Sequence, residues 1–422
     1  MKQTDLKAIL VIGGGISGIT AAVEAAEVGY DVYLVERNPY LGGRVARMNQ
    51  YFPKLCSPYC GLEINFRRIK NNPKIKVFTL AEVENITGKE GNYDITIKQT
   101  PGLVNGNCTA CGKCVEVCPV ERSNDFNLGL DNTKAVYLPH SLAYPMKYTI
   151  DTKVCQGAEC SKCVSACQYD AIDLGMQTQK LEINVGSVIF STGWGPYDAT
   201  KLDNLGYGQY SNVITNVMME RLASLNGPTQ GKIVRPSDGK EVNTIAFVQC
   251  AGSRDENHLP YCSSVCCLGS LKHVTYIKEQ NPDAKVTVFY IDIRAPGTLE
   301  DFYNKVQVYE NLSLIKGKVA KIEEDPQTKE LTVEADDTVS GTKTREKVEM
   351  VVLATGIVPN GLEAKMPDGI TFDNYGFIAS EIPGIYAAGC SKRPADVADS
   401  VRDATGTALK AIQSIVRGEA NG

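Results

Sequence analysis

The first forty residues alternate between short apolar runs and a segment with helical spacing. Residues 8–12 form an apolar run too short for a helix, and residues 19–28 carry apolar side chains at helical spacing. Gly29 separates that segment from a second apolar run at 32–35. The pattern predicts a strand, a helix and a second strand, which together make a βαβ unit.

Five further segments follow along the chain. A β-meander is predicted over 75–100, and a strand over 181–194 ends in Ser191-Thr192-Gly193. From about residue 240 the pattern predicts a second α/β unit, with strands at 244–249, 285–291 and 348–353 and a helix at 267–280. The tail, 384–417, is predicted to be a strand followed by a long helix. Residues 101–180 are rich in cysteine and poor in apolar runs, so they are interpreted as an inserted module.

A glycine motif joins the first strand to the first helix. Gly13, Gly15 and Gly18 follow the GxGxxG spacing, and Glu36 ends the next strand about 20 residues on. In this context Gly13 makes the tight turn, Gly15 lets the backbone approach a pyrophosphate, and Gly18 lets helix and strand pack closely. The free N–H groups at the helix start bind phosphate, and Glu36 can bind a ribose hydroxyl. We therefore predict a dinucleotide site.

Several later motifs resemble those of two-dinucleotide-domain flavoproteins. They are Leu41-Gly42-Gly43-Arg44, Ser191-Thr192-Gly193, Ala354-Thr355-Gly356 and 384–390. The resemblance implies that the dinucleotide is FAD, held by Gly13, Gly15, Gly18, Glu36, Gly42, Gly43, Arg44, Val83, Thr192, Gly193, Gly389 and Cys390. The last motif normally ends in Asp, but here Cys390 occupies that position, and a thiol is a weak acceptor. The helix after about Ala395 is expected to aim its N-terminus at the flavin.

The second α/β unit lacks a complete glycine motif. After the strand at 244–249 comes Cys250-Ala251-Gly252, with one glycine where a nicotinamide-binding turn carries three. We therefore expect no NAD(P)H site, so reducing equivalents must arrive by another route.

Eight cysteines of the inserted module fall into two runs. Cys108, Cys111, Cys114 and Cys118, followed by Pro119, have the spacing of a bacterial ferredoxin. The second run consists of Cys155, Cys160, Cys163 and Cys167. It departs from the ferredoxin pattern in two ways: four residues separate its first two cysteines, and Gln168 follows it where proline is usual. Because the fourth cysteine of each run binds the other cluster in two-cluster ferredoxins, we predict two [4Fe–4S] clusters with Cys167 and Cys118 exchanged. A zinc knuckle is the weaker alternative, since no histidine is nearby.

The remaining cysteines are less standard. Cys250, Cys262, Cys266 and Cys267 are interpreted as ligands of a third [4Fe–4S] cluster near the flavin; the alternative is a set of buried small residues. Cys56 and Cys60 have three possible roles: a redox dithiol, an additional contact to a cluster, or packing without a chemical role. His140, His258 and His273 show no haem or metal spacing.

Composition narrows the function further. Fifteen cysteines in 422 residues, without a signal peptide, favour metal or redox chemistry over a secreted disulfide scaffold. The net charge of -5, with no basic block, argues against nucleic acid as a partner. No run of about 18 apolar residues occurs, so no membrane span is expected.

Taken together, the flavin motifs, the ferredoxin module and the Cys-Ala-Gly-Ser-Arg-Asp segment at 250–255 resemble the flavin-carrying A subunits of the heterodisulfide reductase family. Within it, length and motifs are most similar to the flavin subunit of quinone-interacting membrane-bound oxidoreductases of sulfate reducers. The resemblance implies an α/β, thioredoxin-reductase-like flavoprotein with an inserted two-cluster module. The predicted division is an FAD-binding domain at 1–100, 181–235 and 351–422, the module at 101–180, and a degenerate nucleotide-binding-like domain at 236–350.

The same resemblance implies an electron-transfer role without a catalytic residue of its own. The expected complex passes electrons between menaquinol and adenylylsulfate reductase, through a haem-bearing membrane subunit together with a second flavin/iron–sulfur subunit. The chain would be cytoplasmic and peripheral to the membrane. The alternatives are a soluble heterodisulfide-reductase-type flavin subunit, a stand-alone flavin oxidoreductase acting on NAD(P)H or a disulfide, and a scaffold with relic clusters.

Overall fold

The first unit of the chain is built on a seven-stranded mixed sheet. The computed structural model describes residues 3–361 and 366–420. The sheet order is β3-β2-β1-β10-β5-β4, with β23 also pairing with β10. The parallel strands are β1 (Gln3–Ile12), β2 (Val32–Glu36), β3 (Ile75–Thr79), β10 (Gln179–Phe190) and β23 (Ile385–Ala387). The antiparallel hairpin is β4 (Ala81–Lys89) and β5 (Asn92–Gln99).

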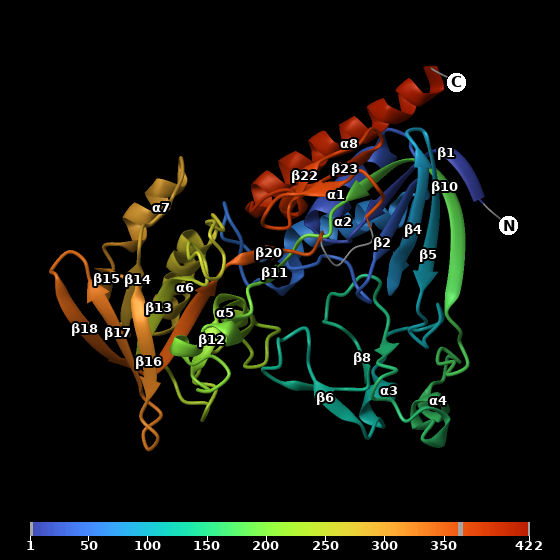
Figure 1. Cartoon of the computed structure of the whole chain (residues 1–422). Helices are drawn as coiled ribbons and strands as arrows, with labels where there is room; N and C mark the ends of the chain where they lie inside the picture. The colour runs from blue at the N-terminus through green and yellow to red at the C-terminus, as the bar shows by residue number, and fades with distance from the viewer. Residues whose placement is uncertain (1–2, 362–365, 421–422) are drawn as a thin grey trace.

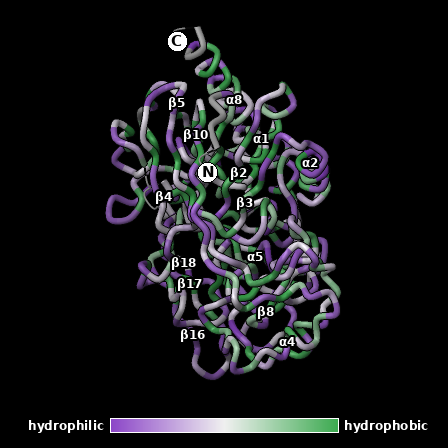
Figure 2. Tube along the Cα trace, turned by 90° about the vertical axis from the view of Figure 1, so that its right-hand side faces the viewer, coloured by the Kyte–Doolittle hydropathy of each residue, from purple (hydrophilic) through white to green (hydrophobic). Residues whose placement is uncertain are grey.

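Three helices accompany this sheet: α1 (Ile16–Glu27), α2 (Tyr59–Asn71) and α8 (Val397–Ala420). In Figure 1, α8 runs alongside α1, and the two helices make many contacts. Apolar side chains of α1 and α8 pack with β1 and β2 into one core, because each helix turns an alanine-rich face to the sheet. Figure 2 shows hydrophilic positions concentrated in the outer loops and in α2.

A second unit is built on a five-stranded parallel sheet. Its order is β12 (Val213–Thr215), β19 (Met350–Thr355), β13 (Thr244–Ala251), β14 (Lys285–Tyr290) and β15 (Leu312–Lys316). Helices α5 (Asn216–Ala223), α6 (Cys266–Gln280) and α7 (Leu299–Val306) belong to it, as does the antiparallel sheet of β16 (Val319–Glu324), β17 (Leu331–Asp337) and β18 (Thr342–Val348). The chain passes between the two units twice, through β11 (Trp194–Pro196) and β20 (Ile357–Pro359), which pair antiparallel.

The inserted module lies below the first sheet in Figure 1. It contains α3 (Lys113–Glu116), β6 (Glu121–Ser123), β7 (Asn132–Lys134), β8 (Val136–Tyr137), β9 (Thr149–Ile150) and α4 (Lys162–Ala166). A small apolar core around Val104, Val136 and Ile172 packs against most of its cysteines. Outside the module, β21 (Thr371–Phe372) and β22 (Ile378–Ser380) form a short antiparallel pair ahead of β23.

The structure differs from the predicted division in two places. The predicted FAD-binding domain resumes at residue 351, but β19 extends to Thr355 within the second sheet. The sequence pattern assigns residues 213–223 to the FAD-binding domain, but β12 pairs with β19 and α5 packs in the core of the second unit. The reason is that β12 is only three residues long, so its pattern carries no sign of which sheet it joins.

Candidate flavin and cluster sites

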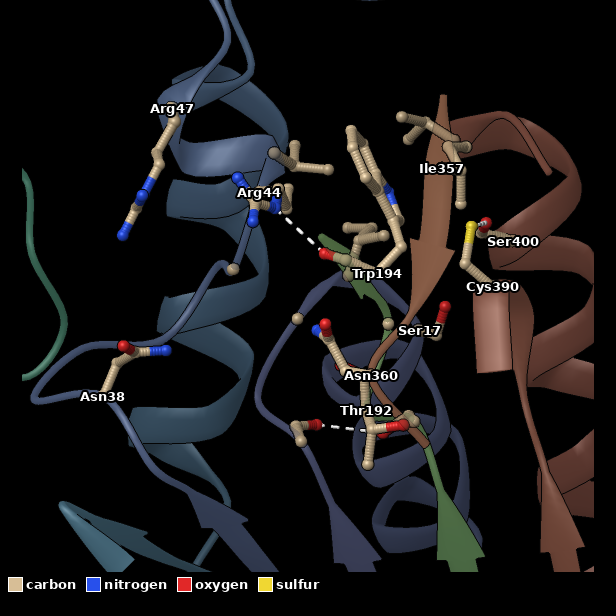
Figure 3. Close-up of a pocket in the computed structure, with 18 of the residues that line it drawn as sticks. Ser17, Asn38, Arg44, Arg47, Thr192, Trp194, Ile357, Asn360, Cys390 and Ser400 are labelled. Carbon is tan, nitrogen blue, oxygen red and sulfur yellow. Dashed lines mark hydrogen bonds between the residues drawn. The ribbon is translucent and has the colours of Figure 1, made fainter. Parts of the chain in front are cut away.

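A cavity of about 560 Å³ lies where the carboxyl ends of β1 and β10 face the second unit. Nine of the twelve predicted FAD residues line it: Gly13, Gly15, Glu36, Gly43, Arg44, Val83, Thr192, Gly193 and Cys390. Gly18, Gly42 and Gly389 do not line it. Figure 3 shows side chains that line this cavity from the first unit and from the two connecting strands, among them Arg44, Trp194 and Ile357.

The three glycines of the first motif have different surroundings. Gly13 has a φ of +107°, which favours glycine, and a Cβ there would collide with the backbone of Ser191. A Cβ at Gly18 would overlap the carbonyl oxygen of Gly13, so Gly18 serves helix–strand packing. No atom lies within 4 Å of a Cβ built at Gly15, so that position opens directly into the cavity.

The carboxylate of Glu36 is held in place at the end of β2. The backbone N–H of Gly14 donates to its Oε2 at 2.7 Å, and the N–H of Asn38 donates to its Oε1 at 2.7 Å. The side-chain amide of Asn38 adds a bond of 2.6 Å to Oε1. Burial raises the pKa of Glu36, against these hydrogen bonds, which lower it. The carboxyl group is therefore oriented at the cavity wall by the same turn that carries the glycines.

Arg44 reaches across the cavity to β11. Its Nε donates to the carbonyl oxygen of Trp194 at 2.9 Å, and its guanidinium carbon lies 5.1 Å from the centre of the Trp194 ring (Figure 3). Burial and the nearby Arg47 lower the pKa of Arg44 to about 10, which leaves it charged at neutral pH. A fixed cation at this wall suits an anionic ligand.

The loop around Cys390 is braced by neighbouring side chains. The Cys390 thiol donates to the carbonyl oxygen of Ala395 at 3.4 Å, and burial raises its pKa. The N–H of Gly389 donates to Asp403 at 2.7 Å, and Asp403 also pairs with Lys392 at 2.7 Å. Because α8 begins beside Cys390, its first turn lines the cavity, as the sequence predicts for the helix after Ala395.

Three ionisable residues of the second unit also line the cavity, and sequence reasoning missed them. Glu220 lies on α5, while Lys272 and His273 lie on α6. Lys272 Nζ is 2.7 Å and His273 Nε2 2.6 Å from Glu220 Oε1. Burial would raise the pKa of Glu220, but Lys272 and His273 outweigh it and hold that pKa well below its usual range. Their helical spacing alone gave no signal, since charged residues on a helix usually face water.

The structure brings seven of the eight cysteines of the inserted module into two groups. Cys108, Cys111, Cys114 and Cys167 surround a small cavity of about 20 Å³. Burial raises the pKa of Cys114 to about 11, and Cys108 and Cys111 add to the rise. In the second group, burial raises the pKa of Cys163, and Cys155 and Cys118 raise it further by charge repulsion.

The third set gathers at the start of α6. Burial raises the pKa of Cys250 to about 11, and the proximity of Cys267 and Cys262 contributes. Burial also raises the pKa of Cys266, followed by repulsion from the other three thiols of the set. The Cys266 thiol donates to the carbonyl oxygen of Thr355 at 3.7 Å. Four thiols thus converge beside β13 and β19.

These groups differ from a site for a single ion. Within 3–361 and 366–420, no three His, Cys, Asp or Glu side chains converge as ligands of one metal ion. A [4Fe–4S] cluster holds its cysteines farther apart, because each sulfur binds a different iron. Four thiols around a small cavity, with no histidine among them, fit such a cluster.

The Cys56–Cys60 pair and the histidines lie outside the cysteine groups described above. Cys56 is half-buried and Cys60 exposed, and both help raise the pKa of Tyr51, for which burial is the largest cause. His140 is buried against Phe126, and His258 accepts or donates a hydrogen bond with Tyr197 at 2.8 Å. In the part of the chain that the structure describes, no helix is both long and apolar enough to span a membrane.

Comparisons with known proteins agree with this geometry. Residues 8–59 match the family model described as FAD dependent oxidoreductase. The chain is similar over 97 % of its length to the thioredoxin reductase of Lactococcus lactis in its FR conformation, with a TM-score of 0.54 and 14 % identity, covering 99 % of that chain. The predicted thioredoxin-reductase-like fold is thereby confirmed. The match at residues 8–59 agrees with the predicted FAD-dependent oxidoreductase.

Two curated relatives extend the comparison to the cysteine-rich regions. The A subunit of the H2:CoB–CoM heterodisulfide, ferredoxin reductase of Methanothermobacter marburgensis is 39 % identical over 425 residues, which are 97 % of this chain and 64 % of that protein. The iron–sulfur A subunit of the CoB–CoM heterodisulfide reductase of Methanocaldococcus jannaschii is 39 % identical over 420 residues, covering 95 % and 63 %. The chain thus spans under two thirds of their length, and over that span it is similar to the A subunits of these heterodisulfide reductases.

Proposed function

We propose that the chain is an FAD- and iron–sulfur-containing electron-transfer subunit of the heterodisulfide reductase type. One observation carries the proposal: the third cysteine set begins directly behind the cavity that contains the FAD motif. Val265 lines that cavity, and Cys266 is the next residue on α6. A redox centre held by these cysteines would adjoin the wall of the cavity that FAD is proposed to occupy.

The residues around the cavity fit FAD. Gly15 leaves room for a pyrophosphate, and the first turn of α1 offers it free N–H groups. Glu36 is oriented for a ribose, and Arg44 supplies a fixed positive charge. When bound, FAD supplies the ability to accept two electrons and release them one at a time, and the residues of this chain bind it, orient it and exclude water.

The cysteine groups support the proposed ligand sets. Cys167 lines the small cavity of the first run, as the exchange of fourth ligands requires. Cys118 correspondingly adds to the raised pKa of Cys163 in the second group. We therefore propose one [4Fe–4S] cluster at each group and a third at Cys250, Cys262, Cys266 and Cys267, each accepting one electron at a time.

Electrons are proposed to enter and leave through partner proteins. The end of β13 carries Cys250, and the turn after it has the single glycine Gly252 where a nicotinamide-binding turn carries three glycines, so NAD(P)H is not the proposed donor. The relatives are named as subunits of larger enzymes, and one of them carries hydrogen, ferredoxin and the CoB–CoM heterodisulfide in its name. Assembly with further redox subunits is the corresponding proposal for this chain.

A narrower assignment follows from the resemblance of the motifs. We propose that the complex passes electrons between menaquinol and adenylylsulfate reductase, and that its other members include a haem-bearing membrane subunit together with a second flavin/iron–sulfur subunit. The chain would then be cytoplasmic and held at the membrane by its partner.

The experiment is purification of the native complex with analysis of flavin, iron and subunits. After separation from the second flavin/iron–sulfur subunit, we expect one FAD and about twelve irons in this chain, from three four-iron clusters. In a Cys266→Ser, Cys267→Ser variant the FAD should remain while quinol-linked electron transfer stops. FMN in place of FAD would refute the flavin assignment, and full transfer without the third cluster would refute the relay. Partners that lack haem would refute only the narrower assignment.

A further inference from the structure

Arg221 lies where three parts of the chain meet. This arginine of α5 is fully buried, and its guanidinium bonds to each part. Nε donates to Asn127 of the inserted module at 2.9 Å, Nη1 to the carbonyl oxygen of Arg47 in the first unit at 3.2 Å, and Nη2 to the carbonyl oxygen of Asn226 at 3.1 Å. One planar side chain therefore ties together the module, the first unit and the second unit.

The loop that carries Asn127 is wedged between the two larger units. Phe126 packs in the core formed by α1 and the first sheet, whereas Leu130 packs against the core of the second unit. The Arg221 guanidinium carbon lies 4.7 Å from the centre of the Phe126 ring, and that of Arg47 lies 5.5 Å from it. The module is thus anchored by residues 124–130 as well as by its two connecting strands.

The joint adjoins the flavin cavity. Tyr40 and Arg47 both line that cavity. The Tyr40 ring meets Phe126 edge-on, with centres 5.6 Å apart, and Tyr40 accepts a hydrogen bond of 2.8 Å from Arg47. A displacement of the loop would therefore shift the residues at the wall of the cavity, and a shift of that wall would displace the loop.

The chemistry of Arg221 favours a geometric role. No carboxylate forms an ion pair with it among the described residues, so carbonyl and amide oxygens and an aromatic face compensate its charge. Burying a charge is costly unless all of its bonds are made, and a guanidinium makes them in fixed directions. Such a group holds its three partners in one arrangement and is destabilising in any other.

We propose that Arg221 is a positioning residue that fixes the inserted module, and the cysteines it carries, relative to the flavin cavity. The inference rests on the proposed function, because it assigns to this arrangement the passage of single electrons between the cavity and the module. The module has its own small core, so losing the joint should displace it without unfolding it.

The test compares Arg221→Met with Asn127→Ala in the full-length protein. Asn127→Ala removes the module's side of the joint and leaves the α5 side chain in place, so it serves if the arginine variant fails to fold. The matched control is Asn105→Ala, since the amide of Asn105 donates to Asp170 within the module. FAD and iron content, hydrogen exchange of each unit, and cluster reduction after photoreduction of the flavin are measured.

In both joint variants, FAD and iron should remain, and residues 124–130 should exchange about tenfold faster or more, as expected for the loss of a bond to a charged donor. Reduction of the module clusters should lose its fast phase, while reduction of the third cluster should not change. The control should behave as the unmodified protein. Unchanged exchange in 124–130, or equal slowing at all clusters, overturns the proposal. Unmodified protein without FAD or iron would instead refute the proposed function.

Discussion

Replacing Lys272 by Met should leave the buried carboxylate of Glu220 without its cation. The side chains of Lys272 and Glu220 are 5 % and 10 % exposed, and their charged atoms are 2.7 Å apart. Lys272 Nζ also donates to the carbonyl oxygen of Gln50 at 2.6 Å. Burial, together with the charge of Lys272, lowers the pKa of His273, and its ring nitrogen shares a hydrogen bond of 2.6 Å with Glu220. Met retains most of the apolar stem, so the change isolates the charge.

The expected loss of unfolding free energy is about 3–5 kcal/mol, the usual cost of removing one partner of a buried ion pair. Glu220 keeps bonds from the N–H of Asn49 at 2.9 Å and from Tyr276 at 3.3 Å, which favours the lower part of that range. In the double variant Glu220→Gln, Lys272→Met no ion remains buried, so much of the loss should be recovered.

The pH dependence of the variant should have the opposite sign to that of the parent. In the parent, burial raises the pKa of Glu220 but Lys272 and His273 hold it below the ordinary value of 4.5. That stabilisation is present above about pH 4.5 and is lost as the pH falls towards the folded-state pKa. Without Lys272, burial dominates and raises the folded-state pKa. Lowering the pH from about 7 to about 5.5 should then stabilise the variant.

The assay is urea unfolding followed by circular dichroism at both pH values, with flavin content determined in parallel. Lys410→Met is the control, since Lys410 is 52 % exposed and pairs with Glu381 at 3.0 Å on the surface. The control should lose less than about 1 kcal/mol. If the Lys272 variant loses no more than this control, or shows no stabilisation on acidification, Glu220 and Lys272 do not behave as a buried ion pair.

Three further outcomes are expected. Gly15→Ala should fold normally but lose FAD, because its Cβ enters the open cavity. Gly18→Ala should instead lower the unfolding temperature, because its Cβ overlaps the carbonyl oxygen of Gly13. Flavin absorbance and thermal unfolding distinguish the two variants. Cys167→Ser should damage the cluster held by residues 108–114 and spare the other module cluster, as judged by electron paramagnetic resonance; the reverse would refute the exchanged ligands. NADH should not bleach the flavin at a useful rate, and rapid stoichiometric bleaching would contradict the loss of the nicotinamide site.

Sequence reasoning is strongest where the chemistry is local. The GxGxxG turn and each ferredoxin run place most of their residues within one segment, so the spacing limits what can converge, although Cys167 joins the first run from the second. It failed for Glu220 and Lys272, because their burial depends on Asn49 and Gln50, which are 171 and 222 residues away in the sequence. It also missed that β12 joins the second sheet, since three residues carry no register signal. In both cases the missing information is a tertiary contact, which no single segment of the sequence encodes.

The turn after β13 shows how the second unit keeps its fold where the glycine motif is incomplete. Its remaining glycine, Gly252, has a φ of +80°, and a Cβ there would collide with the ring of Tyr197. The glycine is therefore required for packing against the segment after β11, and its presence says nothing about a phosphate. Cys250 itself has a φ of +56°, and the N–H of Ser253 donates back to its carbonyl oxygen at 3.1 Å.

The same turn is tied to the second connection between the units. The hydroxyls of Ser253 and Ser263 lie 3.3 Å apart, and Ser263 accepts a bond of 2.8 Å from the N–H of Ile357, which lines the flavin cavity. Hydrogen bonds within the protein thus occupy the place where a nucleotide turn would present its N–H groups to a phosphate. A turn that is held by its own hydrogen bonds, with thiols beside it, can keep a redox centre at a fixed separation from the cavity. The same hydrogen bonds disfavour a hydride-carrying dinucleotide, which would need free N–H groups in this turn.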